Sequence, residues 1–232
     1  MLLTTEMILL RERARTFLLR TFPLCLFFFC SCEKYSCPPS QELVADTMIL
    51  PVRQNALIDH FYPNNNFSTS PTLLAGAAGP GIEQQSLLDF DYSLLPANAT
   101  IVHAYLNLYA DTNNLYSFYF APGHFVSDGT NAWKLKRILA NWQQSTVTWN
   151  TRPANDSIHQ LLLSASTSAW EKYRVDVTTL ATDQFKAPAT YHGFSMSIQD
   201  TLAYACVSFC SSAHSYTQLA PTLEVVYLHP KQ

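Results

Sequence analysis

The sequence has little charge. Only 13% of its 232 residues are Asp, Glu, Lys or Arg, and 17 acidic residues slightly outnumber 14 basic ones. A typical soluble domain has about 25% charged residues. A chain with this small acidic excess offers no basic surface for a phosphate backbone, so we expect no nucleic acid among its partners. Uncharged polar residues take the place of charge, which suits β domains that meet sugars or other surfaces outside the cell.

The sequence also lacks the short motifs of common catalytic and nucleotide-binding sites. It contains no GxSxG, HExxH, P-loop or GxGxxG motif. Glycoside hydrolysis needs two carboxylates facing each other across a cleft. Spacing singles out no such pair among Asp59, Asp89, Asp91, Asp176 and Glu224. Asp89 and Asp91 share one face of an expected strand, where we expect a solvated edge. We therefore predict a protein that is not an enzyme and has no cofactor.

Zinc-site spacing is absent as well. No CxxC pair and no Cys/His cluster has the spacing of a zinc site. Two clusters carry oxygen atoms that could ligate calcium, namely Asn64, Asn65 and Asn66, and Asp111, Asn113 and Asn114. Asn and Asp are also common in turns, which explains both clusters as well or better. We assign no metal ligand, and a structural calcium ion stays an alternative.

The longest apolar segment lies near the N-terminus and is too short to span a bilayer. Residues 22–29 are apolar, and Arg11, Arg13, Arg15 and Arg20 precede them. A spanning helix needs roughly 20 apolar residues, whereas a positive region followed by a short apolar one is typical of an export signal. We predict a signal peptide over residues 1–31, with Met7 as an alternative start.

Cys32 has the neighbours that bacterial lipoprotein processing favours. Ser31 precedes it, and Phe29 stands three residues before it, where Leu is usual. Each buried methylene of an attached lipid contributes about 0.8 kcal/mol of membrane binding. We therefore predict an exported protein, lipid-anchored at Cys32 in the outer membrane or at the cell surface; an ordinary signal peptide cut nearby is the alternative. Residues 32–45 have little periodicity and are expected to form a tether.

Residues 46–232 alternate short apolar runs with Pro, Asn, Gly and Asp. A dozen such runs, including 47–52, 56–62 and 145–149, predict a single all-β domain, a jelly-roll-type antiparallel β-sandwich. Only residues 177–186 have the composition of a short helical turn or two, for which Asp176 can act as a cap.

Cys206 and Cys210 lie in a segment that is expected to be a strand. Four residues of strand span about 13 Å, whereas a disulfide needs Cα atoms within about 7 Å. We predict two free, buried thiols on one face of this strand.

Residues 100–110 form the clearest expected strand. Alternation places Val102, Ala104, Leu106 and Leu108 in the core. The opposite face carries Ile101, His103, Tyr105, Asn107 and Tyr109.

That opposite face is the predicted ligand-binding site. Tyr105 and Tyr109 would lie about 13 Å apart along the strand, which suits successive sugars of a glycan, with Asn107 as the polar contact between them. Trp133, just before another expected strand, is a third aromatic candidate. The alternative is that both faces are covered and the tyrosines merely pack.

Five segments match a known family in order along the chain. They include FYPNNNFSTSPTLLAG, the segment of residues 86–109, NWQQSTVTWNTRPA, YRVDVTTL and the closing hairpin of residues 207–227. In these features the chain resembles the DNRLRE domain family, a jelly-roll β-sandwich group that includes carbohydrate-binding modules. The resemblance implies a glycan as ligand. Asp89 stands where Arg or Lys is common, which makes an acidic glycan less attractive. Trp142 and Trp149 are expected to anchor the connection 141–154 onto the core.

Two function classes remain. One is a surface-tethered, non-catalytic glycan-binding module, and the other is a structural or adhesive surface protein that binds other proteins. The first requires an exposed aromatic platform, and the second an apolar patch or an unprotected edge strand.

Overall fold

The computed structural model describes residues 41–113 and 120–231. Residues Gln41–Gln232 form one compact unit. The predicted signal peptide, Cys32 and most of the tether lie outside the described residues, as does Asn114. Among the helices of the described part, none has the length and apolar character needed to cross a membrane.

The described part is an antiparallel β structure, as predicted. Every strand pairing in it is antiparallel. The strands are β1 (Leu43–Asp59), β2 (Thr72–Ala78), β3 (Glu83–Phe90), β4 (Thr100–Leu108), β5 (Phe125–Asp128), β6 (Trp133–Ile138), β7 (Asn155–Leu163), β8 (Tyr173–Asp176), β9 (Phe194–Ile198), β10 (Tyr204–Cys210) and β11 (Thr222–Pro230). The helical elements are α1 (Thr178–Lys186) and two 3-10 turns, η1 (Tyr92–Leu94) and η2 (Thr217–Leu219).

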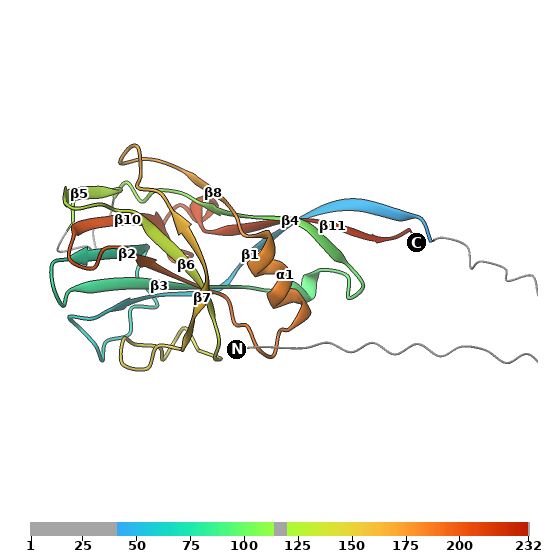
Figure 1. The fold of residues 1–232 in the computed structure, drawn as a ribbon, viewed down its shortest axis with the longest axis horizontal. Helices are drawn as coiled ribbons and strands as arrows, with labels where there is room; N and C mark the ends of the chain where they lie inside the picture. Colours follow the sequence, from blue (N-terminus) through green and yellow to red (C-terminus); the bar gives the residue numbers. More distant parts are fainter. Residues whose placement is uncertain (1–40, 114–119, 232) are drawn as a thin grey trace, which may run out of the picture. The chain divides into compact units, whose positions relative to one another are not determined.

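Strand β1 belongs to both layers of the sandwich (Figure 1). Its first half pairs with β11 as far as Pro51, and from Val52 it pairs with β3. The register shifts between Val52 and Gln54. Proline has no N–H to donate to a ladder, so Pro51 suits the point where the strand changes partner. The expected runs 47–52 and 56–62 are therefore mostly one strand, and β1 already begins at Leu43, inside the expected tether.

The first layer has the strand order β1–β11–β4–β8. The second layer is built on β3, which pairs with the second half of β1 on one edge. Its other edge carries β2 and then β9. From there β2 continues through β10 to β5, and β9 continues through β6 to β7.

The main core lies between the two layers. Leu106 of β4 and Val225 of β11 come from the first layer, and Leu88 of β3 and Phe194 of β9 from the second. Helix α1 covers part of this core with Leu180. Its position confirms the helical segment predicted at residues 177–186, and the carboxylate of Asp176 accepts the backbone N–H of Thr178 at 2.9 Å.

A second apolar cluster lies under the connection 141–154. Trp142, Val147 and Trp149 pack there with Ile58 of β1. The Trp142 indole donates to the His192 carbonyl at 3.0 Å. The anchoring role predicted for both tryptophans is confirmed. The run 145–149, however, is not a strand, because its apolar side chains are buried by packing onto β1 and β3 without pairing of its backbone in a ladder.

Both cysteines of β10 are buried and unbonded to each other. They stand at positions of equal parity in one ladder with β2, so they share a face. The prediction of two free buried thiols is confirmed.

Candidate functional site

Two of the predicted ligand-binding residues, Tyr105 and Asn107, lie on β4, between β11 and β8, and Tyr109 follows the strand directly. Leu106 and Leu108 point into the core, whereas Tyr105 and Asn107 are half-buried on the opposite face. This face is the outer surface of the first layer.

The start of β4 differs from the predicted alternation. Val226 of β11 pairs with His103, and Tyr227 pairs with Ile101, so Val102 is the extra residue of a β-bulge. The bulge reverses the pattern before it: Ile101 is buried in the main core, and Val102 is 37% exposed. The predictions for these two side chains were wrong, because a bulge cannot be seen in the apolar pattern of one strand.

Tyr105 is covered by a cation from the neighbouring strand. The Arg174 guanidinium carbon of β8 lies 3.4 Å from the ring centroid, in the geometry of a cation–π contact. Arg174 also donates from Nη2 to Glu224 of β11 at 3.1 Å. That hydrogen bond is the main reason why the pKa of Arg174 is raised. Tyr105 is thus one part of an aromatic and charged surface rather than a bare ring.

Asn107 and Tyr109 extend this surface. The Asn107 amide donates to the Thr222 hydroxyl at 3.5 Å. The Lys172 ammonium lies 5.5 Å from the Tyr109 ring centroid. A small cavity of about 190 Å³ is lined by Asn107, Tyr109, Lys172 and Arg174, among others. The structure therefore brings Tyr105, Asn107 and Tyr109 together on one face.

Two residues of this face were missed from the sequence. Arg174 lies on β8, which pairs with β4, and Lys172 comes just before β8 at the alternate position, so both point to the side of Tyr105 and Tyr109. The alternation of polar residues in KYRVD was the available signal, but the partner strand that it faces cannot be read from the sequence.

Trp133 does not belong to the site. Its side chain is completely buried in the main core and meets Tyr173 edge-on at a centroid distance of 5.4 Å. Trp133 is the first residue of β6 and shares an inward face with Leu135, so it cannot form an exposed aromatic wall.

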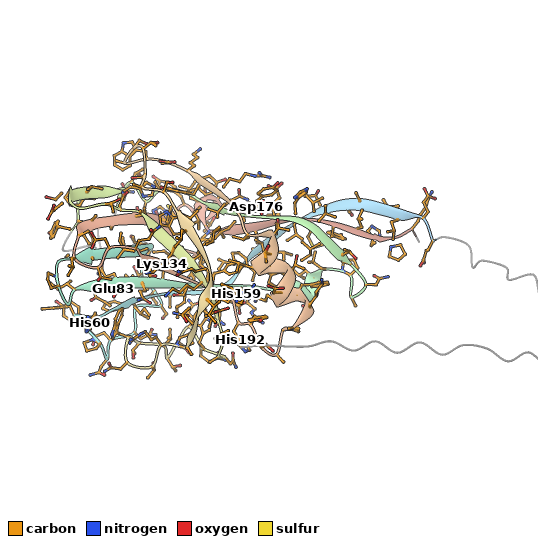
Figure 2. The ribbon with its side chains drawn as sticks, viewed as in Figure 1. His60, Glu83, Lys134, His159, Asp176 and His192 are labelled. Carbon is orange, nitrogen blue, oxygen red and sulfur yellow. The ribbon has the colours of Figure 1, made fainter. Side chains whose placement is uncertain are left out.

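A larger groove adjoins the Tyr105 surface. It has a volume of about 630 Å³ and lies between β7 and α1, where Figure 2 shows His159 and Asp176. Asp176 connects the two features, because it lines the groove and pairs with Tyr105 in the ladder. Buried Arg137 also lines the groove, in ion pairs with Asp183 and, at 3.5 Å, with Asp156.

The five carboxylates considered for catalysis all have structural partners. Asp89 was expected on a solvated edge, but it is buried and accepts from Arg53, Gln54 and Gln184. It is buried because β1 covers this edge of β3. The others bind Gln84 (Asp59), Ser93 (Asp91), Thr178 (Asp176) and Arg174 (Glu224).

The Asn64–Asn66 cluster has structural contacts as well. Asn66 donates to the Val147 carbonyl at 2.7 Å, and Asn150 donates to the Asn64 side chain at 2.9 Å. These bonds attach the loop after β1 to the connection 141–154.

Comparison with known protein families identifies the family of the chain. No curated protein matches the chain at a significant level. Residues 47–227, from β1 into β11, match the family described as carbohydrate-binding module family 96. A match over this much of the sequence shows the family, and with it a carbohydrate-binding module. The chain belongs to carbohydrate-binding module family 96.

Proposed function

We propose that this chain is a non-catalytic, lipid-anchored protein of the cell envelope whose β-sandwich binds a glycan. Its family supports carbohydrate binding. The observation that supports the location is the outer surface of β4, where Tyr105 and Tyr109 each face a cation from the segment that pairs with β4. We place the glycan along Tyr105, Asn107 and Tyr109.

This surface combines the groups that sugar recognition needs. Tyrosine rings offer flat apolar area, which a sugar would reach at Tyr105 by displacing the Arg174 guanidinium, and a few placed polar groups give orientation. Asn107, Lys172 and Arg174 can donate hydrogen bonds to sugar oxygens, and the carboxylates of Asp176 and Glu224 can accept from hydroxyls. Two cations and two carboxylates balance each other, so the surface suits a neutral glycan.

The groove gives a longer glycan room to continue. Because Asp176 lies at the junction, a chain bound across Tyr105 would pass this carboxylate and enter the space beside His159 and Thr179. A volume of about 630 Å³ lies within the range of ligand-binding sites.

A glycan-array screen followed by titration tests the proposal. The unit Gln41–Gln232 is compact by itself, so the titration uses this part of the chain. We expect Tyr105→Ala and Tyr109→Ala each to weaken binding of the selected glycan roughly tenfold, equivalent to about 1 to 2 kcal/mol. Tyr62→Ala is the matched control, since Tyr62 is an exposed tyrosine in the loop after β1. Unchanged affinity in both folded β4 variants would remove this surface as the site.

One observation favours the second candidate function, a structural or adhesive role through protein contacts. Within the described residues β7 pairs with β6 alone, and its exposed side carries Ile158 and Leu162, which are 81% and 59% exposed. Apolar side chains on an edge strand are typical of a protein-binding site. If this role is the true one, Ile158→Lys with Leu162→Lys will abolish adhesion of cells that display the protein, while Tyr105→Ala will not.

A further inference from the structure

Three buried side chains of different types meet at one end of the sandwich. Asp111 follows β4, Cys210 is the last residue of β10, and His214 lies in the loop after β10. One carboxylate oxygen, the sulfur and one ring nitrogen all lie within 4.8 Å of one another. The three residues are 1%, 1% and 6% exposed.

The spacing of these atoms approaches that of metal ligands. His214 Nε2 lies 3.6 Å from Asp111 Oδ1, which is too long for a direct hydrogen bond. Zinc bonds of about 2.0 to 2.3 Å at tetrahedral angles separate neighbouring ligand atoms by roughly 3.3 to 3.6 Å. One pair already has this separation, and because all three atoms lie within 4.8 Å of one another, the sulfur needs to move by roughly 1.3 Å at most.

Backbone contacts fix the three positions, and the His214 N–H donates to the Ser211 carbonyl at 3.2 Å. The Asp111 N–H donates to the Ser208 carbonyl at 3.2 Å, and the Cys210 N–H donates to the Tyr109 carbonyl at 2.9 Å. The Thr72 hydroxyl donates to the other Asp111 oxygen, Oδ2. Outer contacts of this kind orient the ligands of metal sites.

We propose that Asp111, Cys210 and His214 bind one divalent transition-metal ion, with zinc as the best match. A thiolate, an imidazole and a carboxylate are all zinc ligands, whereas magnesium and calcium bind oxygen ligands and disfavour sulfur. A water molecule would supply the fourth ligand.

Metal binding changes the protonation of two ligands. Burial, with a further contribution from Asp111, raises the pKa of Cys210 to about 12, so the thiol keeps its proton until a cation replaces it. His214 Nδ1 accepts the Tyr216 N–H at 3.1 Å, so Nε2 holds the proton of the neutral ring. Binding through Nε2 releases the thiol proton and moves the ring proton to Nδ1. The exposed loop at Tyr216 must then shift, because two N–H groups would face each other.

The ion would connect the two layers. Asp111 continues the first-layer strand β4, and Cys210 belongs to the second-layer strand β10. The cysteines of the described residues form no disulfide. Exported domains are often stabilised by disulfides, and here a metal ion bound between the two layers would take that role.

Cobalt and zinc binding test the site in the full-length chain. Cys25, Cys30, Cys32 and Cys37 are first replaced by Ser in every protein, so that Cys206 and Cys210 are the remaining thiols. We expect the metal-free protein to take up one Co²⁺ per chain, with a thiolate-to-cobalt charge-transfer band. Zn²⁺ should displace it and raise the thermal unfolding midpoint by several degrees.

Matched variants identify the ligands. Cys210→Ser should lose the charge-transfer band, and His214→Gln should weaken cobalt binding at least tenfold. Cys206→Ser changes a buried cysteine on the same face of the same strand and should keep the band. If Cys210→Ser fails to fold, the Cys206→Ser protein still tests the assignment. Cys210 is then the remaining thiol, so a charge-transfer band in this protein must come from Cys210. Absence of a band in the parent protein, or its loss in Cys206→Ser, overturns the proposal.

Discussion

Gly193 illustrates how a single residue sets the spacing between two strands. It stands just before β9 with a positive φ of 101°, and its backbone touches β3. A Cβ at this position would lie 2.1 Å from the Leu88 carbonyl oxygen. Because that oxygen belongs to a rigid ladder, the space cannot be opened by a side-chain rotation.

We expect Gly193→Ala to lower the free energy of unfolding by about 2 to 4 kcal/mol, since it combines backbone strain with overpacking. Gly79→Ala is the matched control: φ is +88°, but nothing lies within 4 Å of the added carbon. It should cost about 1 kcal/mol. Urea unfolding of both variants measures the difference, and equal losses would contradict the role of the Leu88 contact.

Single residues also show what the sequence can reveal about the site. Alternation alone was enough to place Tyr105 and Asn107 opposite Leu106, because the strand is regular there. The same rule applied to WKLK would have turned Trp133 inward with Leu135, and placing Trp133 just before the strand instead of in it led to the error. Arg174 could not be assigned to Tyr105, because the two are neighbours only through strand pairing.

At the scale of elements, the sequence predicted most strands and the helix, but not their partners. Apolar alternation reports which face of a strand is buried, not which strand lies beside it. The bulge at Val102 and the change of partner at Pro51 both arise from pairing with β11 and β3. Cys210 and His214 are four residues apart in the chain, whereas Asp111 meets them only because the end of β4 lies beside the end of β10.

The start of α1 gives a prediction at this scale. Asp176 accepts from the Thr178 hydroxyl at 2.6 Å and from its N–H at 2.9 Å. These bonds lower the pKa of Asp176, and the bond from the Thr178 hydroxyl has the larger effect. A lowered pKa means that the stabilisation is complete above about pH 4, the ordinary value, and is lost as the pH falls through the folded-state pKa.

We therefore expect Asp176→Ala to lose about 1 kcal/mol at pH 7, because it removes two hydrogen bonds to Thr178 at the start of the helix, and to approach the native protein in stability at acidic pH. Asp176→Asn keeps the acceptor oxygen and should retain most of the stability at both pH values. Urea unfolding at neutral and acidic pH makes the comparison. A loss in Asp176→Ala that stays constant with pH would show that the carboxylate charge is not involved.

At the scale of the whole molecule, the proposed anchor determines where the domain works. Cys32→Ala should move the exported protein from the membrane fraction to the soluble fraction, because the lipid would be its membrane attachment. Cys37→Ala is the matched control, since Lys34, Tyr35 and Ser36 before it lack the favoured pattern. Fractionation and immunoblotting measure the distribution. Membrane retention of Cys32→Ala would refute the anchor.

The pairing of β1 also has a mechanical consequence. The chain enters the sandwich at Leu43, opposite Pro230 of β11, and β11 in turn pairs with β4 (Figure 1). If the membrane holds the N-terminal side and a glycan holds β4, tension passes from β1 through β11 to β4, along the strand direction. The two ladders are then sheared, so that many hydrogen bonds bear the load together instead of opening one after another. The strand order of the first layer would therefore let the domain resist unfolding when it is pulled between the membrane and its ligand.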